Sequence, residues 1–387
     1  MYFTNEPEHI GVLRTTIHRF IEAELPRDKA RRLDREKTFD RDSFRRLTEL
    51  GICGLTVSEH FGGNRDLVAA VMVIEELCRR GTSLAGPFIH CAFYGALNIE
   101  HNGSEQQKEE LLPRLLRGEL MFSYGLSEPD VGGDLASVGT QARREGDEIV
   151  INGVKRWCTG ARFADYIYCL TRSDPEAPRY RNLSFILVPT SAPGIVVTDI
   201  EHIGLRYAET CDVVLENVRV PAANIVGGEV GWNNGWGMLA GPALDIEKIE
   251  VAACALGIAS AALEDAWQYS QERRQFGKAI CGHQAVRHSL ADLRTKLHAC
   301  RLMLYHAAWL ADSGRACTVE TSMAKLFITE TALEAAIASQ RIMGAYGCAE
   351  EYDMERHVRD LLVMPIIGGS SDMQRNNIAN RLGLPTR

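Results

Sequence analysis

A polar turn containing two glycines is followed by a strand with an aromatic side chain, and this combination suits the binding of a flat molecule. Residues 127–134 read Ser-Glu-Pro-Asp-Val-Gly-Gly-Asp. Gly132 and Gly133 remove side chains where a ligand or another backbone approaches. Trp157 and Thr159 end the strand and offer a ring and a hydroxyl. We therefore expect a site for a flat aromatic cofactor with a polar edge, with a purely structural tryptophan hairpin as the alternative.

A carboxylate at the start of an apolar helix is the second feature that could do chemistry. Residues 245–250 read Asp-Ile-Glu-Lys-Ile-Glu and lead directly into the apolar segment 251–263. At helical spacing Glu247 shares a face with Val251, so its carboxylate points toward packed apolar surface. Burial raises the pKa of a carboxylate toward the range useful for a base, while the helix N-terminus lowers it. The alternative is that these acidic residues only stabilise the helix start, and Glu250 is the second candidate for a base.

Hydrophobic periodicity predicts the elements that position these residues. Helical spacing fills residues 8 to about 119, with helices over 41–50, 67–78 and 105–116. Asn152-Gly153 lies between two alternating runs and predicts a hairpin turn. Short β-type runs then predict strands over 166–170, 183–188, 195–197 and 211–220. Helical patterns return at about residue 232, with helices over 251–263, 284–312, 319–343 and 354–361.

These patterns predict an α+β chain of three parts. We expect an all-helical domain over residues 1–119, a β-barrel or sandwich over residues 120–231 and a bundle of antiparallel helices over residues 232–387. The segment 251–263 is apolar on nearly every side, which places its helix inside the bundle.

Composition and charge limit the classes of function. The 387 residues are 45% hydrophobic and 24% charged, as in ordinary soluble globular proteins. The net charge of -8 argues against nucleic acid as the main partner. The eleven cysteines are scattered without a C-x-x-C pair, which predicts reduced, buried thiols in a cytoplasmic protein. Residues 1–7 show no targeting signal, and no apolar run reaches the length of a membrane helix. We predict no metal site.

Several separated motifs resemble the acyl-CoA dehydrogenase family. Two segments resemble motifs of the family's flavin-binding middle domain. They are Leu126-Ser127-Glu128-Pro129 with the following glycine and Asp134, and Ile151-Asn152-Gly153-x-Lys155-x-Trp157-x-Thr159. The family's Arg-x-x-Phe-Gly motif is similar to Arg273-x-x-Phe276-Gly277, where a basic helix end with a glycine stop is the alternative. Its Gln-x-x-Gly-Gly-x-Gly loop is similar to residues 341–347. The chain departs from the family at Gly133, Arg341 and Ala345, where serine, glutamine and glycine are usual.

This resemblance extends over the full chain and implies FAD as the cofactor. It implies helical, β and four-helix-bundle domains, with an arginine and a later glutamine reaching the cofactor of a neighbouring subunit. A homotetramer that passes electrons to an electron-transfer flavoprotein is implied as well. The implied cofactor contacts are Tyr124, Leu126, Ser127, Gly132, Gly133, Trp157, Thr159, Arg273, Phe276, Gln284, Arg341, Gly344, Ser370 and Asp372. The implied substrate contacts are Gly133, Asp245 and Lys248.

The usual catalytic base of the family is missing from this chain. Members commonly carry Tyr-Glu-Gly-Thr-Ser-Glu with its first Glu as the base, but Ile367 and Gly368 stand at the Tyr and Glu positions. Forming an α,β double bond in an acyl thioester removes an α proton and a β hydride, so a carboxylate is still required. Glu247 stands where isovaleryl-CoA and prolyl-carrier dehydrogenases place their base. Gly368 can still donate its backbone N–H to the thioester oxygen.

The predicted function is FAD-dependent α,β-dehydrogenation of an acyl-CoA. One alternative is the same chemistry on an acyl or prolyl group tethered to a carrier protein. Lys248, where CoA-linked members usually carry arginine, and residues 300–305 resemble that branch. An alternative of another class is a binding module of the same fold without desaturase activity, against which the acidic net charge counts.

Overall fold

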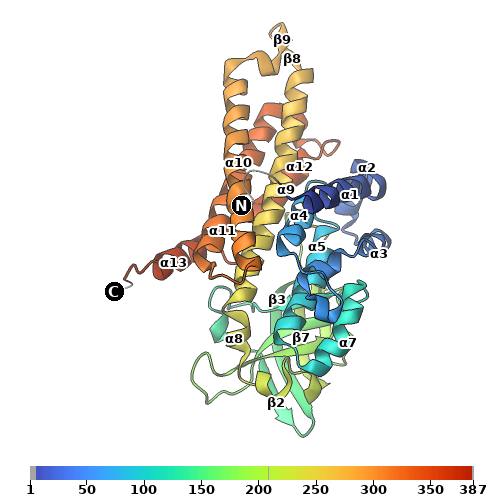
Figure 1. The fold of residues 1–387 in the computed structure, drawn as a ribbon, viewed down its shortest axis with the longest axis vertical. Coiled ribbons are helices and arrows are strands. Elements are labelled where there is room, and N and C mark those ends of the chain that lie inside the picture. The colour runs from blue at the N-terminus through green and yellow to red at the C-terminus, as the bar shows by residue number, and fades with distance from the viewer. Residues whose placement is uncertain (1–5, 208, 386–387) are drawn as a thin grey trace.

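The computed structural model describes residues 6–207 and 209–385. Residues 1–5, on which the prediction about targeting signals partly rests, lie outside this description. Helices, then strands, then helices follow one another along the chain (Figure 1). The predicted fold class is therefore confirmed.

The first part of the chain is helical, and a capping side chain or a proline stands just before several of its helices. Asp66 accepts a hydrogen bond from the Ala69 N–H at the start of α4, and Ser104 and Gln107 form a capping box on α7. Every residue of α4 is buried. A rare π-helix, His90–Leu97, follows α5. The helices are α1 Glu8–Glu24, α2 Arg27–Glu36, α3 Arg41–Thr48, α4 Leu67–Cys78, α5 Ala85–Ile89, α6 Asn98–Asn102 and α7 Glu105–Leu116.

The middle part is a single seven-stranded mixed sheet in the order β1-β4-β2-β3-β7-β6, with β5 paired to β4. Alternate residues of β4 and β5 face different cores. Ile167 and Val188 belong to a core within the sheet region, whereas Leu170 and Phe185 pack in the main core with the helices. The strands are β1 Phe122–Gly125, β2 Gln141–Glu145, β3 Glu148–Thr159, β4 Tyr166–Arg172, β5 Leu183–Pro189, β6 Ile195–Asp199 and β7 Thr210–Pro221.

The hairpin predicted at Asn152-Gly153 is wrong. Both residues lie inside the continuous strand β3, at a register shift against β7. The Asn152 side chain bonds Asn217 across this bulge. A Cβ on Gly153 would lie 2.5 Å from the Thr140 hydroxyl, so glycine is needed for close packing and not for a turn. The chain instead reverses at Gly146, between β2 and β3.

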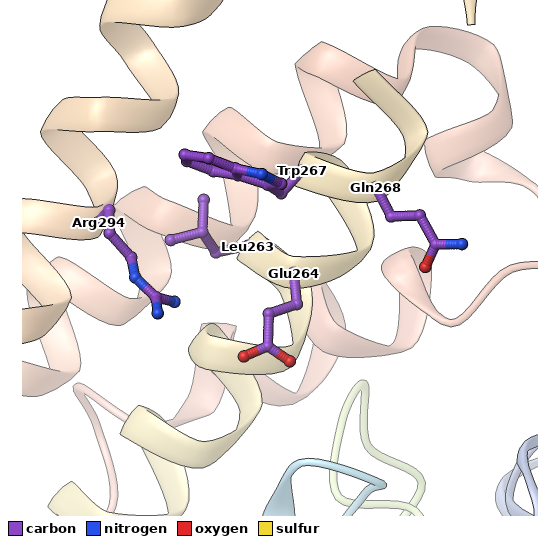
Figure 2. A pocket seen from close by; sticks show the side chains of 5 residues that line it. All are labelled: Leu263, Glu264, Trp267, Gln268 and Arg294. Atoms are coloured by element: carbon purple, nitrogen blue, oxygen red, sulfur yellow. The ribbon is translucent and has the colours of Figure 1, made fainter. Parts of the chain in front are cut away.

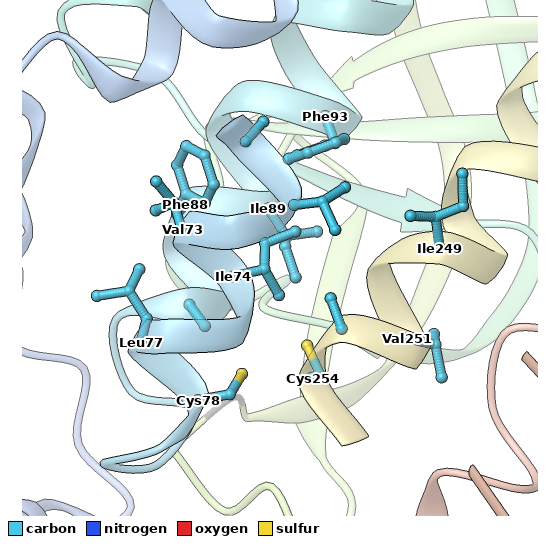
Figure 3. Packing of buried hydrophobic residues seen from close by; sticks show 14 of the residues in the cluster. Val73, Ile74, Leu77, Cys78, Phe88, Ile89, Phe93, Ile249, Val251 and Cys254 are labelled. Carbon is cyan, nitrogen blue, oxygen red and sulfur yellow. The ribbon is translucent and has the colours of Figure 1, made fainter. Parts of the chain in front are cut away.

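The last part is a helical domain dominated by three long helices among the described residues. The helices α9, α10 and α11 run alongside one another, and a small β8–β9 hairpin joins α9 to α10 at the tip (Figure 1). Figure 3 shows the buried side chains of α4 and α5 beside α9, with Cys78 of α4 opposite Cys254 of α9. The elements are α8 Gly235–Leu239, α9 Pro242–Glu272, β8 Arg274–Gln275, β9 Lys278–Ala279, α10 Gln284–Asp312, α11 Thr318–Met343, α12 Met354–Val363 and α13 Ser371–Arg381.

Cysteine placement and helix composition bear on two further predictions. All eleven cysteines lie in the described ranges without a disulfide, and nine of them are buried, as expected for small apolar side chains. Within residues 6–207 and 209–385, no helix combines the length and apolar character needed to cross a membrane.

Candidate active site

Glu247 and Gly368 come together although 121 positions separate them in the sequence. A Cβ built on Gly368 would lie 3.9 Å from Glu247 Cγ and 2.8 Å from Val251 Cγ2. Gly368 has φ +59°, a left-handed conformation that glycine adopts without steric cost. Among the described residues, no protein group accepts a hydrogen bond from the Gly368 N–H. The position of the family's usual base is therefore occupied by backbone beside the Glu247 side chain.

Three residues hold the loop that carries Gly368 through hydrogen bonds to its carbonyl groups. Buried Gln374 donates through Nε2 to the carbonyls of Gly369, at 2.8 Å, and of Gly368, at 3.3 Å. The Ser371 N–H donates to the Pro365 carbonyl at 2.8 Å. Lys325, on α11 and fully buried, donates through Nζ to the same carbonyl at 3.3 Å. This loop is thus fixed from both ends.

Burial and two lysines shift the pKa of Glu247 in opposite directions. Burial raises the pKa of the Glu247 carboxyl to about 7, although the charges of Lys325 and Lys248 oppose the shift. Burial lowers the pKa of the Lys325 ammonium to about 8. Within the described chain, no side chain hydrogen-bonds the Glu247 carboxyl. It is free to accept a proton.

Asp245 and Lys248 are occupied by structural contacts. Lys248 Nζ lies 2.8 Å from Asp245 Oδ1, and both side chains are almost fully buried. Asp245 also accepts hydrogen bonds from the hydroxyls of Thr318, at 2.8 Å, and Thr321, at 3.2 Å. These contacts tie the first turn of α9 to α11. Asp245 and Lys248, two of the three predicted substrate contacts, are thus paired with each other on the helix that carries Glu247.

Two stacked tyrosines face the same part of α9. The rings of Tyr94, in the π-helix, and Tyr124, in β1, stack at 3.9 Å between centroids. Asn98 Nδ2 lies 2.6 Å from the Tyr124 hydroxyl oxygen. Burial, followed by the charges of Glu247 and Glu250, raises the pKa of both tyrosine hydroxyls well above the usual value. Tyr94 was not among the predicted site residues, and no motif pointed to it.

The sheet presents the other side of the site. The backbone N–H of Arg156 donates to the Ser127 carbonyl at 2.9 Å, which joins the polar turn to β3. Trp157 is 53% exposed and has φ +64°, a strained conformation for a residue with a side chain. Thr159 lies within 3.3 Å of the Thr210 hydroxyl. Trp157 thus presents an exposed ring from a strand whose backbone is strained at this residue. Such a ring is suited to pack against a flat aromatic cofactor.

A buried ion pair fixes the same turn to the strand. Lys155 Nζ lies 2.8 Å from Glu128 Oε1 and 3.1 Å from the Leu126 carbonyl. Glu128 also accepts the N–H groups of Gly139, at 2.7 Å, and Thr140, at 2.9 Å. The pair therefore sets the distance between the turn that begins at Leu126 and the strand that carries Trp157.

One glycine of the turn, Gly133, lies close to the start of α13. A Cβ on Gly133 would lie 3.3 Å from Met373 Sδ, whereas one on Gly132 would meet no atom within 4 Å. Ser370 caps α13 by accepting the Met373 N–H at 3.3 Å. Asp372 is exposed and pairs with Arg375. The turn, the α13 start and the Gly368 loop thus form one neighbourhood.

The remaining predicted cofactor contacts lie at the opposite end of the bundle. Arg273, Phe276 and Gln284 are exposed at the tip that joins α9 to α10. Arg341 and Gly344 end α11 near the same tip, where Tyr346 lies 5.7 Å from the Arg273 guanidinium. From Glu247 to the end of α9 the helix rises by about 37 Å at 1.5 Å per residue. Within one chain these residues do not join the site around Glu247.

Comparison of the sequence with known proteins shows the family to which the chain belongs. Models described as the acyl-CoA dehydrogenase N-terminal, middle and C-terminal domains match residues 7–119, 123–218 and 233–383. A probable acyl-CoA dehydrogenase of Bacillus subtilis (strain 168) is 35% identical over 91% of this chain and 92% of its own length. The chain belongs to the acyl-CoA dehydrogenase family. It is an oxidoreductase that acts on a CH–CH bond, which removes support from the alternative of a binding module.

Solved structures of this acyl-CoA dehydrogenase family share the whole fold. A glutaryl-coenzyme A dehydrogenase in complex with glutaryl-CoA superposes with a TM-score of 0.93 at 30% identity, covering 98% of this chain and 97% of that one. A prolyl acyl carrier protein oxidase superposes with a TM-score of 0.91 at 28% identity, covering 98% and 100%. Both similarities extend over all three parts of the acyl-CoA dehydrogenase fold.

Proposed function

We propose that this acyl-CoA dehydrogenase uses Glu247 as the base that removes the α proton of an acyl thioester. The observation that carries the proposal is the position of the Glu247 side chain beside Gly368, where a Cβ would lie 3.9 Å from Glu247 Cγ. Glu247 supplies the carboxylate that the usual position lacks, and it has no competing hydrogen bond among the described residues. A base works best with a pKa close to the working pH, and the Glu247 pKa of about 7 meets that condition.

Gly368 acts through its backbone in this mechanism. As the α proton leaves, the thioester oxygen gains negative charge, and a fixed N–H donor stabilises that charge. The Gly368 N–H is available, and Gln374 and Lys325 hold its loop in place. The rings of Tyr94 and Tyr124 stack on each other, and we propose that they help to exclude water from the reacting atoms.

We propose FAD as the cofactor, which supplies a hydride acceptor when bound. In this chain Trp157 would pack on its ring system, and Ser127 and Thr159 would bond its polar edge. Tyr124, Leu126, Gly132, Gly133, Ser370 and Asp372 complete the proposed set around the site. The strained, exposed Trp157 supports this assignment because a costly backbone conformation is retained where a function requires it.

A second subunit would supply the distant contacts. Arg273, Phe276, Gln284, Arg341 and Gly344 gather at the tip of the bundle, and we propose that they meet the cofactor of a neighbouring copy. Phe276 is 92% exposed, as expected for a side chain that a partner covers. A shallow pocket on α9 and α10, with half-exposed Trp267 beside Leu263, offers further contact surface (Figure 2).

We propose that the assembly is a cytoplasmic homotetramer that passes electrons to an electron-transfer flavoprotein. The domain boundaries proposed are residues 119/120 and 231/232.

The test of the base is Glu247→Gln, which keeps the shape of the side chain and removes its basicity. Anaerobic flavin reduction by a good acyl-CoA substrate should fall by about 10²–10⁴-fold, with unchanged FAD content and thermal unfolding. Glu264→Gln, on an exposed part of the same helix, is the matched control and should retain the parent rate. Reduction of the Glu247→Gln flavin at the parent rate would exclude Glu247 as the base.

A carrier-tethered acyl or prolyl thioester is the second candidate substrate. Lys248 favours it on sequence, and the similar fold of a prolyl acyl carrier protein oxidase adds support. The pairing of Lys248 with Asp245 counts the other way, because it uses this lysine in the fold and not at the substrate. Comparing flavin reduction by CoA thioesters and by carrier-bound thioesters of the same acyl group separates the two.

A further inference from the structure

Glu250 is a buried carboxyl that the proposed reaction does not use. Only 3% of the residue is exposed, yet among the described residues no group hydrogen-bonds or pairs with its carboxyl. A buried polar group without a partner is costly, and native proteins leave few of them. The structure holds Glu250 one turn along α9 from Glu247, on the side of the helix where Cys254 also lies.

The charged groups that act on the pKa of Glu250 are acidic. Glu247 and Cys254 lie on its own helix, and Tyr94 and Tyr124 face it from the π-helix and β1. Lys325 and Lys248, which lower the pKa of Glu247, have no corresponding effect on the pKa of Glu250. Burial, followed by the charges of Glu247 and Cys254, therefore raises the pKa of Glu250 well above its ordinary value. Burial and these neighbouring charges therefore favour the neutral form of the Glu250 carboxyl.

A protonated carboxyl donates one hydrogen bond and still accepts others. Glu250 lies one turn along α9 from Glu247, the residue that the proposed function places against the α carbon. We propose that Glu250 determines substrate specificity by hydrogen-bonding an oxygen or nitrogen atom carried by the acyl group close to its α carbon. The inference rests on the proposed function. It identifies the preferred substrate as a polar acyl thioester and not as one with a plain alkyl chain.

Matched pairs of thioesters test this inference, because each pair differs by one polar atom at nearly constant shape. The pairs are 4-hydroxybutanoyl with pentanoyl and prolyl with cyclopentanecarbonyl, each offered on CoA and on a carrier protein. The parent enzyme should reduce its flavin with at least about tenfold higher kcat/KM for the polar member of one pair, since a site built for a hydrogen bond rejects the analogue that lacks it.

Variants then assign the preference to Glu250. Glu250→Leu should abolish the polar preference, and Glu250→Gln, which keeps a donor, should retain most of it. Glu264→Gln on the exposed part of α9 is the control and should keep the parent ratio. Dissociation constants measured in a Glu247→Gln background should show the same preference without turnover.

Two results would overturn the inference. The inference is wrong if the parent enzyme has the higher kcat/KM for the alkyl member of both pairs. It is also wrong if Glu250→Leu leaves the ratio of kcat/KM between the polar and alkyl members unchanged. Failure of every thioester to reduce the flavin would refute the proposed function itself, and this inference with it.

Discussion

Replacing Lys155 tests how strongly a buried ion pair holds the proposed cofactor turn. The Lys155 side chain is fully buried, and Nζ contacts Glu128 Oε1 at 2.8 Å and the Leu126 carbonyl at 3.1 Å. Lys155→Met keeps most of the aliphatic stem and removes the charge. The Glu128 carboxylate, itself only 10% exposed, then keeps only the N–H groups of Gly139 and Thr140.

Breaking a buried pair by removing one partner costs about 3–5 kcal/mol, because the other charge stays buried without compensation. The two remaining N–H donors to Glu128 reduce this penalty, so we expect about 3 kcal/mol for Lys155→Met. Lys296 provides a matched comparison, since its Nζ pairs with Glu334 at 2.6 Å but the two side chains are 43% and 55% exposed. Lys296→Met should cost less than about 1 kcal/mol.

Urea unfolding followed by tryptophan fluorescence, at fixed protein and FAD concentrations, measures both costs. Adding Glu128→Gln to Lys155→Met should recover part of the loss, because the unpaired charge disappears. Lys155→Met should also weaken FAD retention, since the Ser127 turn loses its support. If Lys155→Met costs no more than Lys296→Met, burial does not govern this pair and the reasoning is refuted.

The same pair predicts a dependence of stability on pH. Burial alone would raise the pKa of Glu128, but the charge and hydrogen bond of Lys155, with the N–H groups of Thr140 and Gly139, lower it below the ordinary 4.5. The pair therefore contributes its full stability above pH 4.5, and loses it as the pH falls through the lower pKa of the folded state. The cost of Lys155→Met should be constant at neutral pH and shrink in acid.

Two further predictions concern the base and the bundle tip. Flavin reduction should increase with pH through about 7, because burial raises the pKa of Glu247 to that value and only its carboxylate accepts a proton. Lys325→Met removes a charge that lowers this pKa, so the midpoint of the pH profile should move upward, and an unmoved midpoint would contradict the assignment. Phe276→Ser should change the free energy of unfolding of a subunit by less than about 0.5 kcal/mol, because the side chain is exposed, yet weaken subunit association in sedimentation. Association at the parent strength would count against a subunit contact at Phe276.

Much of the helical framework could be predicted because its signals are local. The predicted bounds 67–78, 105–116 and 284–312 agree with α4, α7 and α10. An apolar pattern, a capping side chain such as Asp66 or Ser104, and a glycine or proline beyond the end act within a few residues. Residues 85–102 lie in the region predicted to be helical, but their separate helices were not delimited, since this stretch has no side-chain cap and includes the uncommon π-helix.

Local signals failed where one pattern serves two structures. Asn-Gly between alternating runs indicates a hairpin turn, but it also suits a bulge inside one strand. Whether Asn152-Gly153 forms a turn or a bulge depends on two distant residues. Thr140, just before β2, packs against Gly153, and Asn217 of β7 bonds the Asn152 side chain. Neither contact is visible in the sequence near Asn152.

The sequence by itself determined the family resemblance, the vacant base position at Gly368 and the candidate Glu247. Only the tertiary structure decided that these two residues lie close together, that Lys325 lies near them, and that Lys248 pairs with Asp245. The physical reason is distance along the chain. Residues on α9, α11 and the loop before α13 meet through the packing of whole helices, and the resulting burial and charge set the pKa of Glu247.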